Sequence, residues 1–147
     1  MSEDSVSIRN AHLSDIPAIQ VFMQPFVESE FVLPRSDKDM AVLVRHGFVA
    51  TIGDDIVGFA ALEIYSRKLA EIQALAVLSS LQGKGVGSEL VRRCVGRARA
   101  EGVLELMAIT ASDNLFRNVG FDYSLPNQKR ALFLHCLLYT SDAADES

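Results

Sequence analysis

Apolar and polar residues along the chain follow two periods, one typical of strands and one typical of helices. Short apolar or alternating stretches bounded by glycine, proline or acidic residues predict strands. Gly53, Asp54 and Asp55 form a short connection with turn chemistry, so we expect the strands on either side of it to form a hairpin. The predicted strands cover residues 6–9, 48–52, 56–64, 70–78, 103–110 and 129–134.

A first helix is predicted to begin near Ser14 and Asp15, whose side-chain oxygens can cap it, with Pro17 in its first turn. We expect this helix to end at Gln24. A proline follows at once and cannot continue the hydrogen-bond ladder, so residues 25–34 are interpreted as a loop.

Two further helices follow from the same reasoning. Ser36 is placed to cap the second, which the pattern ends at Gly47. The third begins in the glycine-rich segment Gln82–Ser88 and ends at Gly102, and a short helical segment is expected over residues 113–118. The apolar residues of the third helix recur at helical spacing and are Leu90, Val91, Cys94, Val95 and Ala98. This order of elements predicts an α+β fold with a mixed, mostly antiparallel sheet flanked by helices.

Length and composition limit the classes of protein to which the chain can belong. With 147 residues, 49% hydrophobic and 22% charged, it has the size and balance of one soluble globular domain. No apolar stretch approaches the roughly 20 residues that a membrane helix needs, and the acidic N-terminus is unlike a secretory signal, so we expect a cytoplasmic protein. The net charge of −5 disfavours broad binding to nucleic acid. The cysteines and histidines lack metal-ligand spacing, so no metal site is predicted.

Basic residues nevertheless cluster at and after the glycine-rich segment. They are Lys84, Arg92, Arg93, Arg97 and Arg99. The cluster is consistent with a phosphate-facing surface, although a solvated helix face is the commoner fate of such arginines.

The glycine-rich segment reads Gln82-Gly83-Lys84-Gly85-Val86-Gly87-Ser88 and lies between a predicted strand and a predicted helix. The first N–H groups of a helix have no partner inside it, and glycines let an anion approach them closely. Two other phosphate loops are excluded. The nucleoside-triphosphate loop needs Ser or Thr where Gly85 stands, and the dinucleotide fingerprint needs glycine where Leu90 stands. We therefore predict a phosphate-binding turn, the alternative being a glycine turn without a ligand.

The spacing Gln82-x-x-Gly85-x-Gly87, after the strand Leu75-Ala76-Val77, resembles the acetyl-CoA-binding motif of the GCN5-related N-acetyltransferases. The resemblance implies that acetyl-CoA is the co-substrate and that the N–H groups of this turn hold its pyrophosphate. It also implies that the strand backbone pairs with the pantetheine arm and that Gln82 shapes the loop. The residues so assigned to the cofactor are Leu75, Ala76, Val77, Gln82, Gly83, Lys84, Gly85, Val86, Gly87 and Ser88.

Acetyl transfer needs an uncharged amine, whereas an α-amino group with a pKa of about 8 is mostly protonated at neutral pH. Glu71 is the candidate general base, directly or through water. It matches the glutamate that serves as base in histone-acetylating members of the family. A glutamate that only faces solvent is the alternative. The N–H of Val77 is the candidate donor to the oxyanion, and no covalent intermediate is needed, so we interpret Cys94 as a packing residue.

One position departs from the family pattern. Many members have Phe-Tyr before the closing Gly-Phe, and that tyrosine protonates the departing thiolate. This chain has Leu115-Phe116 before Gly120-Phe121. Water is then the first expectation for the proton donor, with Tyr123 or the proton released by the substrate as alternatives.

The run Leu33-Pro34-Arg35-Ser36, the segment Ala70-Glu71-Ile72 and Thr110 together resemble the N-acetylglutamate synthases, from about residue 8 to residue 134. The short, acetyltransferase-only type is the most similar. The resemblance implies L-glutamate as the acceptor, since arginine forks suit carboxylates. An ordinary surface charge is the alternative for each basic position. The residues assigned to the acceptor are Arg35, Ser36, Lys129 and Arg130.

The domain is expected to cover residues 1–135. Residues 136–147 include CLLYTSDAADE, which reads like a translated sequencing-library adapter, so we expect a tail without function. Another small amine or a protein N-terminus stays open as the acceptor, and so does a coenzyme A-binding sensor without catalysis. An exposed last strand often pairs between subunits, so a homodimer also stays open.

Overall fold

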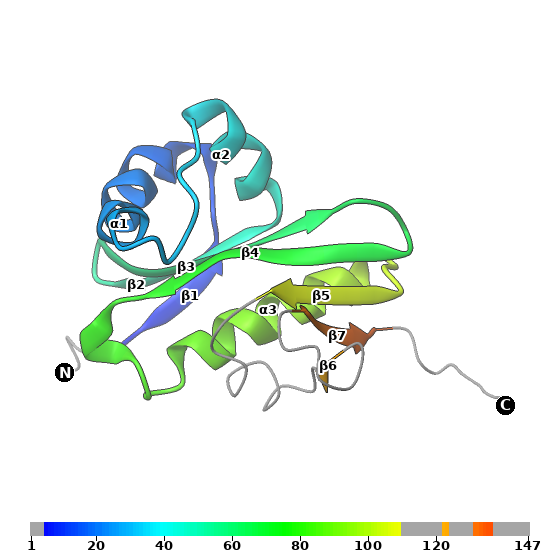
Figure 1. Ribbon diagram of the computed structural model, residues 1–147. Helices are drawn as coiled ribbons and strands as arrows, with labels where there is room; N and C mark the ends of the chain where they lie inside the picture. The colour runs from blue at the N-terminus through cyan, green and yellow to red at the C-terminus, as the bar shows by residue number, and fades with distance from the viewer. Residues whose placement is uncertain (1–4, 110–121, 124–130, 137–147) are drawn as a thin grey trace, which may run out of the picture.

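The computed structural model describes residues 5–109, 122–123 and 131–136 (Figure 1). The strands are β1 (Ser7–Asn10), β2 (Gly47–Ile52), β3 (Asp55–Ile64), β4 (Leu69–Val77), β5 (Glu105–Ile109), β6 (Asp122–Tyr123) and β7 (Ala131–His135). The α-helices are α1 (Ile16–Glu28), α2 (Asp37–Leu43) and α3 (Val86–Ala100), with 3₁₀ turns η1 (Leu13–Asp15), η2 (Val44–His46) and η3 (Ser79–Leu81). The predicted helix over residues 113–118 lies outside the described residues.

The described strands form one sheet in the order β1-β2-β3-β4-β5-β7-β6. Every neighbouring pair is antiparallel except β4 and β5, which run parallel. Helices α1 and α2 cover one face and α3 covers the other (Figure 1). The predicted α+β fold, with a mixed and mostly antiparallel sheet flanked by helices, is confirmed.

Each face of the sheet buries its own apolar cluster. The face toward α3 packs Leu90, Cys94 and their neighbours against residues such as Ile72. The face toward α1 and α2 packs Ile19 and Met40 against the strands. Alternate residues of a strand point to opposite faces, so both clusters are built from the same strands.

The hairpin of β2 and β3 forms as predicted. Gly53 takes a φ of 60°, a left-handed conformation that glycine adopts without strain. Asp55 belongs to β3 and pairs with Ile52, so the connection is shorter than expected. In the part of the chain that the structure describes, no helix is both long and apolar enough to cross a membrane.

The predicted end of α1 at Gln24 is wrong, because the helix continues through Pro25 to Glu28. Pro25 lacks the N–H that would bond to the carbonyl of Val21. Val21 is 76% exposed, so solvent can satisfy that carbonyl. The rings of Phe22 and Phe26, 5.2 Å apart, pack across the last turns of the helix.

The helical structure ends at Gly47 as predicted, although only its first part, α2, is α-helical and η2 carries it on to His46, with Gly47 as the C-cap. Gly47 is also the first residue of β2, with an extended φ of −113°. A Cβ at this position would lie 3.2 Å from the carbonyl oxygen of Leu43 and 3.3 Å from the ring of Phe59. Glycine is needed here for close packing between η2 and the sheet. Ser36 caps α2 as predicted, since its Oγ accepts the N–H of Asp39 at 3.1 Å.

Strands β4 and β5 pair over only part of their length. Leu69–Ile72 of β4 pairs with residues 105–108 of β5, and no later pairing between them occurs within the described residues. Ala74 has a φ of 61°, an unusual conformation for a residue with a Cβ, and the register between β3 and β4 shifts nearby. Figure 1 shows β4 running on past the arrowhead of β5 toward η3. The later half of β4 therefore has an edge that no described strand covers.

Candidate active site

The glycine-rich turn enters α3 through two residues in the left-handed region. Gly83 has a φ of 82° and Gly85, the residue before α3, has a φ of 87°. A Cβ placed on either glycine would have nothing within 4 Å. The outer side of the turn is thus open, and the glycines are required by the backbone rather than by contacts with neighbouring side chains.

Several N–H groups of this turn have no hydrogen-bond partner among the described residues. The first helical bond of α3 runs from the N–H of Glu89 to the carbonyl of Gly85, at 3.0 Å. Among the described residues no hydrogen bond engages the N–H groups that precede it, those of Gly83, Gly85, Val86, Gly87 and Ser88. Lys84 differs from expectation, because its N–H donates to the carbonyl of Leu81 at 3.3 Å. The remaining donors, at the positive end of the helix dipole, suit an anionic group.

The open edge of β4 leads into this turn. The N–H of Leu78 donates to the carbonyl of Val57 at 2.8 Å, and the register pairs Ala76 with Phe59. Backbone groups alternate in direction along a strand, so those of Ala76 face β3, whereas those of Leu75 and Val77 face the open edge.

Gln82 ties the turn to this edge. Its Nε2 donates to the carbonyl of Val77 at 3.1 Å. The Val77 carbonyl is thereby satisfied, and the Val77 N–H is left directed to the open edge.

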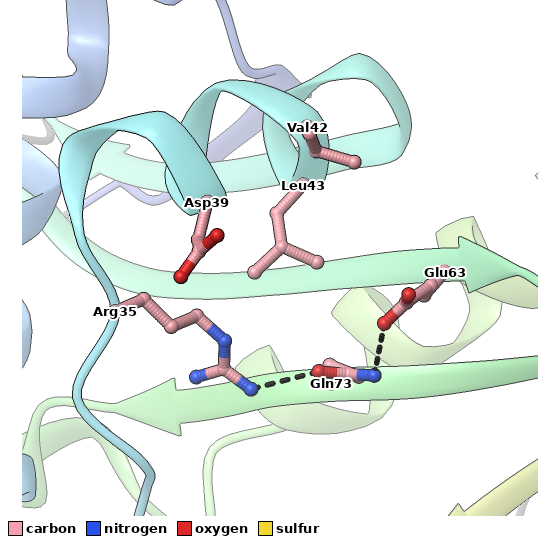
Figure 2. A pocket seen from close by; sticks show the side chains of 6 residues that line it. All are labelled: Arg35, Asp39, Val42, Leu43, Glu63 and Gln73. Atoms are coloured by element: carbon pink, nitrogen blue, oxygen red, sulfur yellow. Dashed lines mark hydrogen bonds between the residues drawn. The ribbon is translucent and has the colours of Figure 1, made fainter.

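A pocket of about 350 Å³ lies between α2 and the hairpin of β3 and β4 (Figure 2). The residues that line it are Arg35, Asp39, Val42, Leu43, Glu63 and Gln73. Arg35 reaches into it from the segment before α2, and Figure 2 shows its guanidinium directed toward Gln73 on β4. The pocket thus combines one cation with two carboxylates.

Two hydrogen bonds hold the guanidinium of Arg35. Its Nη1 donates to the carbonyl of Leu33 at 3.0 Å, and its Nη2 donates to Oε1 of Gln73 at 2.8 Å. Burial lowers the pKa of Arg35, an effect that the nearby carboxylates of Glu63 and Asp39 oppose. The group nevertheless stays charged at neutral pH, because an arginine is effectively always protonated in proteins.

Glu71 lies on the same face of β4 as Gln73. It is partly buried, and its Oε1 accepts the hydroxyl of Tyr65 at 2.6 Å. Gln73 donates to the Tyr65 oxygen at 3.1 Å and also to Glu63. Burial first, and then the hydrogen bond to Glu71, raise the pKa of Tyr65 to about 12. Tyr65 therefore keeps its proton at neutral pH and acts toward Glu71 as a donor.

A family model described as Acetyltransferase (GNAT) family matches residues 17–121. The chain belongs to this family. Its fold, its open edge on β4 and the free N–H groups of the turn agree with that assignment. As a member of this family, the chain is an acetyl-CoA-dependent N-acetyltransferase.

Relatives of this acetyltransferase differ in length. An uncharacterized N-acetyltransferase of Chlorobaculum tepidum is 33% identical over 114 residues, which cover 78% of this chain and 74% of that protein. An amino-acid acetyltransferase of Neisseria meningitidis is 31% identical over 134 residues, 87% of this chain but only 31% of that protein. The N-acetylglutamate synthase of Neisseria gonorrhoeae, solved with coenzyme A and N-acetyl-glutamate, superposes with a TM-score of 0.78 at 26% identity, covering 90% of this chain and 35% of that one. The chain thus spans about a third of these two Neisseria proteins.

The geometry fits the co-substrate of the family. The free N–H groups of the turn suit a pyrophosphate. The backbone of Leu75 and the N–H of Val77, which face the open edge, suit an extended amide-containing arm such as pantetheine. Ala76 is bound to β3, so its backbone is not available for this pairing. The individual cofactor contacts stay predictions.

Two expected acceptor residues, Lys129 and Arg130, lie outside the described residues, as do Phe116 and the tail from residue 137. The hydroxyl oxygen of Ser36 accepts the capping hydrogen bond of α2, and a contact of Ser36 with an acceptor stays a prediction. Cys136 is included in the predicted tail, yet it is buried, and its N–H donates to the carbonyl of Leu104 at 2.8 Å.

The sequence reasoning missed Tyr65, Gln73 and Glu63. Glu63 and Tyr65 are two residues apart on the β3 side of the hairpin, as Glu71 and Gln73 are on β4, so each pair shares one face. Polar residues recurring at a spacing of two within otherwise buried strands were the available signal. The register, which pairs Glu63 with Glu71, was needed to bring the two pairs together.

The basic cluster on α3 has mixed roles. Arg92 and Arg93 are exposed and pair with Glu89, at 3.7 Å and 3.3 Å. Arg97 instead lies 5.2 Å from the centre of the Phe48 ring and donates to Asn10 at 3.1 Å. Arg97 therefore fastens α3 to the sheet rather than facing a phosphate.

Proposed function

We propose that this N-acetyltransferase moves the acetyl group of acetyl-CoA to the α-amine of an amino acid, and that L-glutamate is the acceptor. The observation that carries the proposal is the pocket in which a half-buried, doubly anchored Arg35 faces a group of carboxylates close to Glu71. Such a pocket matches a zwitterion, because the arginine suits the carboxylate and the acidic residues suit the ammonium group.

Arg35 retains binding capacity after its two internal bonds. A guanidinium has five N–H donors, and the carbonyl of Leu33 and the amide of Gln73 use one each. The remaining donors are available for a two-pronged contact with a carboxylate. Because the anchors fix the side chain before the acceptor arrives, little conformational entropy is lost on binding.

Glu71 is the proposed proton acceptor. One of its oxygens is engaged by Tyr65, and its other oxygen makes no hydrogen bond within the described residues. That second oxygen is free to accept a proton from the acceptor's ammonium group, directly or through water. The proton must leave before the nitrogen can act as a nucleophile.

Acetyl-CoA supplies the activated acetyl thioester when it is bound. In this proposal the N–H groups of the turn bind its pyrophosphate, the backbone of Leu75 and Val77 aligns its arm, and the Val77 N–H donates to the oxygen on which negative charge develops. Lys129 and Arg130 are proposed for the second carboxylate of glutamate. The names of the Neisseria relatives, an amino-acid acetyltransferase and an N-acetylglutamate synthase, support this choice of acceptor.

Steady-state kinetics of Arg35→Lys tests the proposal. A lysine keeps the charge but cannot make the two-pronged contact, so the KM for L-glutamate should rise roughly 10- to 100-fold, since a lost contact to a charged group has that magnitude. The KM for acetyl-CoA should stay within about twofold, because no residue of the turn lines the pocket that contains Arg35. Arg92→Lys, an equivalent change at an exposed arginine of α3, is the control and should behave as wild type. An unchanged KM for glutamate in Arg35→Lys would remove the glutamate assignment.

A further inference from the structure

Four side chains form a continuous line of hydrogen bonds across the acceptor pocket. Arg35 bonds to Gln73 at 2.8 Å, Gln73 bonds to Tyr65 at 3.1 Å, and Tyr65 bonds to Glu71 at 2.6 Å. The line joins the proposed carboxylate site to the proposed base. It connects three separate parts of the chain, namely the segment before α2, the residue that follows β3 and the middle of β4.

The direction of every proton in this line follows from chemistry. Arginine has only donors, so the Gln73 atom facing it must be the carbonyl oxygen. The Gln73 amide nitrogen therefore faces Tyr65 and donates to its oxygen. Because Tyr65 accepts there and has a single proton, that proton is directed to Glu71. The line thus runs from a cation to a carboxylate with all donors pointing the same way, an arrangement in which each bond strengthens its neighbours.

We propose that Tyr65 is a positioning residue for the base, and that Gln73 couples it to the acceptor's carboxylate site at Arg35. This inference rests on the proposed function. The Tyr65 hydroxyl holds one oxygen of Glu71 and thereby presents the other oxygen to the amine. Gln73 holds Arg35 with one end and Tyr65 with the other, so the carboxylate and the amine of one acceptor are positioned by a single connected unit.

Each position in the line then has its own kinetic signature. Arg35 contacts the acceptor, so its replacement acts mainly on the KM for the acceptor. Tyr65 acts through Glu71, so its replacement acts on kcat. Gln73 bonds to both Arg35 and Tyr65, so Gln73→Leu should raise the KM for the acceptor and also lower kcat.

The decisive experiment is a double-mutant cycle of Tyr65→Phe and Glu71→Gln, measured by coenzyme A release with L-glutamate. Tyr65→Phe removes only a hydroxyl from a side chain that is 51% exposed, so the fold is expected to persist. We expect kcat to fall roughly 10-fold or more, the scale of a lost hydrogen bond to a charged group, with the KM for acetyl-CoA unchanged. In the Glu71→Gln background the same change should have less than about a twofold effect, because the group on which Tyr65 acts is gone.

Ser66→Ala is the matched control. Ser66 lies next to Tyr65 in the same hairpin, and its hydroxyl accepts the N–H of Lys68 at 3.1 Å without joining the line. Its kcat should equal that of wild type. Wild-type kcat in Tyr65→Phe, or an equal fall with and without Glu71, would overturn the positioning role of Tyr65. Wild-type kcat in Glu71→Gln alone would instead overturn the proposed base, so the two failures are distinguishable.

Discussion

Replacement of Gly85 by alanine tests the turn that opens α3. Gly85 has a φ of 87°, and a Cβ there would meet nothing within 4 Å. Replacing Gly85 by alanine should therefore destabilise the protein through backbone strain and not through a steric clash. Holding a residue with a Cβ in the left-handed region costs about 1–2 kcal/mol. At roughly 2–4 °C per kcal/mol for a chain of about this size, the melting temperature should fall by about 2–8 °C.

The same strain should weaken the binding of acetyl-CoA. Relief of the strain rotates the peptide groups at the start of α3, and these carry the free N–H donors of Val86 and Gly87. Loss of one charged hydrogen bond weakens binding by roughly 10-fold or more. Titration calorimetry with acetyl-CoA and thermal unfolding of the same preparation measure both effects.

Gly96→Ala is the control in the same helix. A Cβ at Gly96 would also have no neighbour within 4 Å, but the backbone there is helical. Alanine should therefore raise the free energy of unfolding by about 1 kcal/mol. Its acetyl-CoA affinity should not change. If Gly85→Ala lowers the melting temperature as expected while binding acetyl-CoA as tightly as wild type, the pyrophosphate does not sit on this turn.

Three other variants or treatments have defined outcomes. Glu71→Gln should lower kcat roughly 100-fold or more with little change in acetyl-CoA affinity, and wild-type rates from pH 6 to 9, roughly the range around an α-amine pKa, would exclude Glu71 as base. Arg97→Ala should lower the free energy of unfolding by about 1–3 kcal/mol in urea denaturation, because it removes the contacts with Phe48 and Asn10, whereas the exposed Arg92→Ala should change it by less than about 0.5 kcal/mol. Burial raises the pKa of Cys94 to about 12, so a thiol reagent at pH 8 should leave Cys94 unmodified in the folded protein and modify it after denaturation, and rapid modification of the folded protein would contradict its packing role.

Much of the fold was predictable because the signals are local. A cap at Ser36 and a turn at Gly53 each depend on neighbouring residues alone, and both were placed correctly. The end of α1 was placed incorrectly, because a proline in the last turn of a helix is tolerated when the carbonyl that it leaves unbonded faces solvent. Whether that carbonyl is exposed depends on the tertiary structure. The need for glycine at position 47 was likewise not predictable, because it comes from close packing against Phe59, which only the folded sheet brings near.

The candidate site also has one part that the sequence could predict and one part that it could not. The glycine-rich turn is one continuous segment, so its chemistry could be argued from the sequence. The acceptor pocket brings Arg35 to Gln73, 38 positions later in the chain. Tyr65 and Glu71 meet across a hairpin whose register the sequence does not specify. Arg97 looked like a solvated helix residue, since nothing local indicates that Asn10 and Phe48 lie beneath it.

The central claim is that this acetyltransferase recognises an α-amino acid by its carboxylate. Its most direct test is the rate of coenzyme A release by the wild-type protein with L-glutamate, L-glutamine, glutamate α-amide and spermidine at equal concentrations. We predict the highest kcat/KM for L-glutamate, a lower value for L-glutamine, and a loss of roughly 10-fold or more for the α-amide, which removes the charge that Arg35 would bind. A kcat/KM for the α-amide or spermidine equal to that for L-glutamate would contradict the claim.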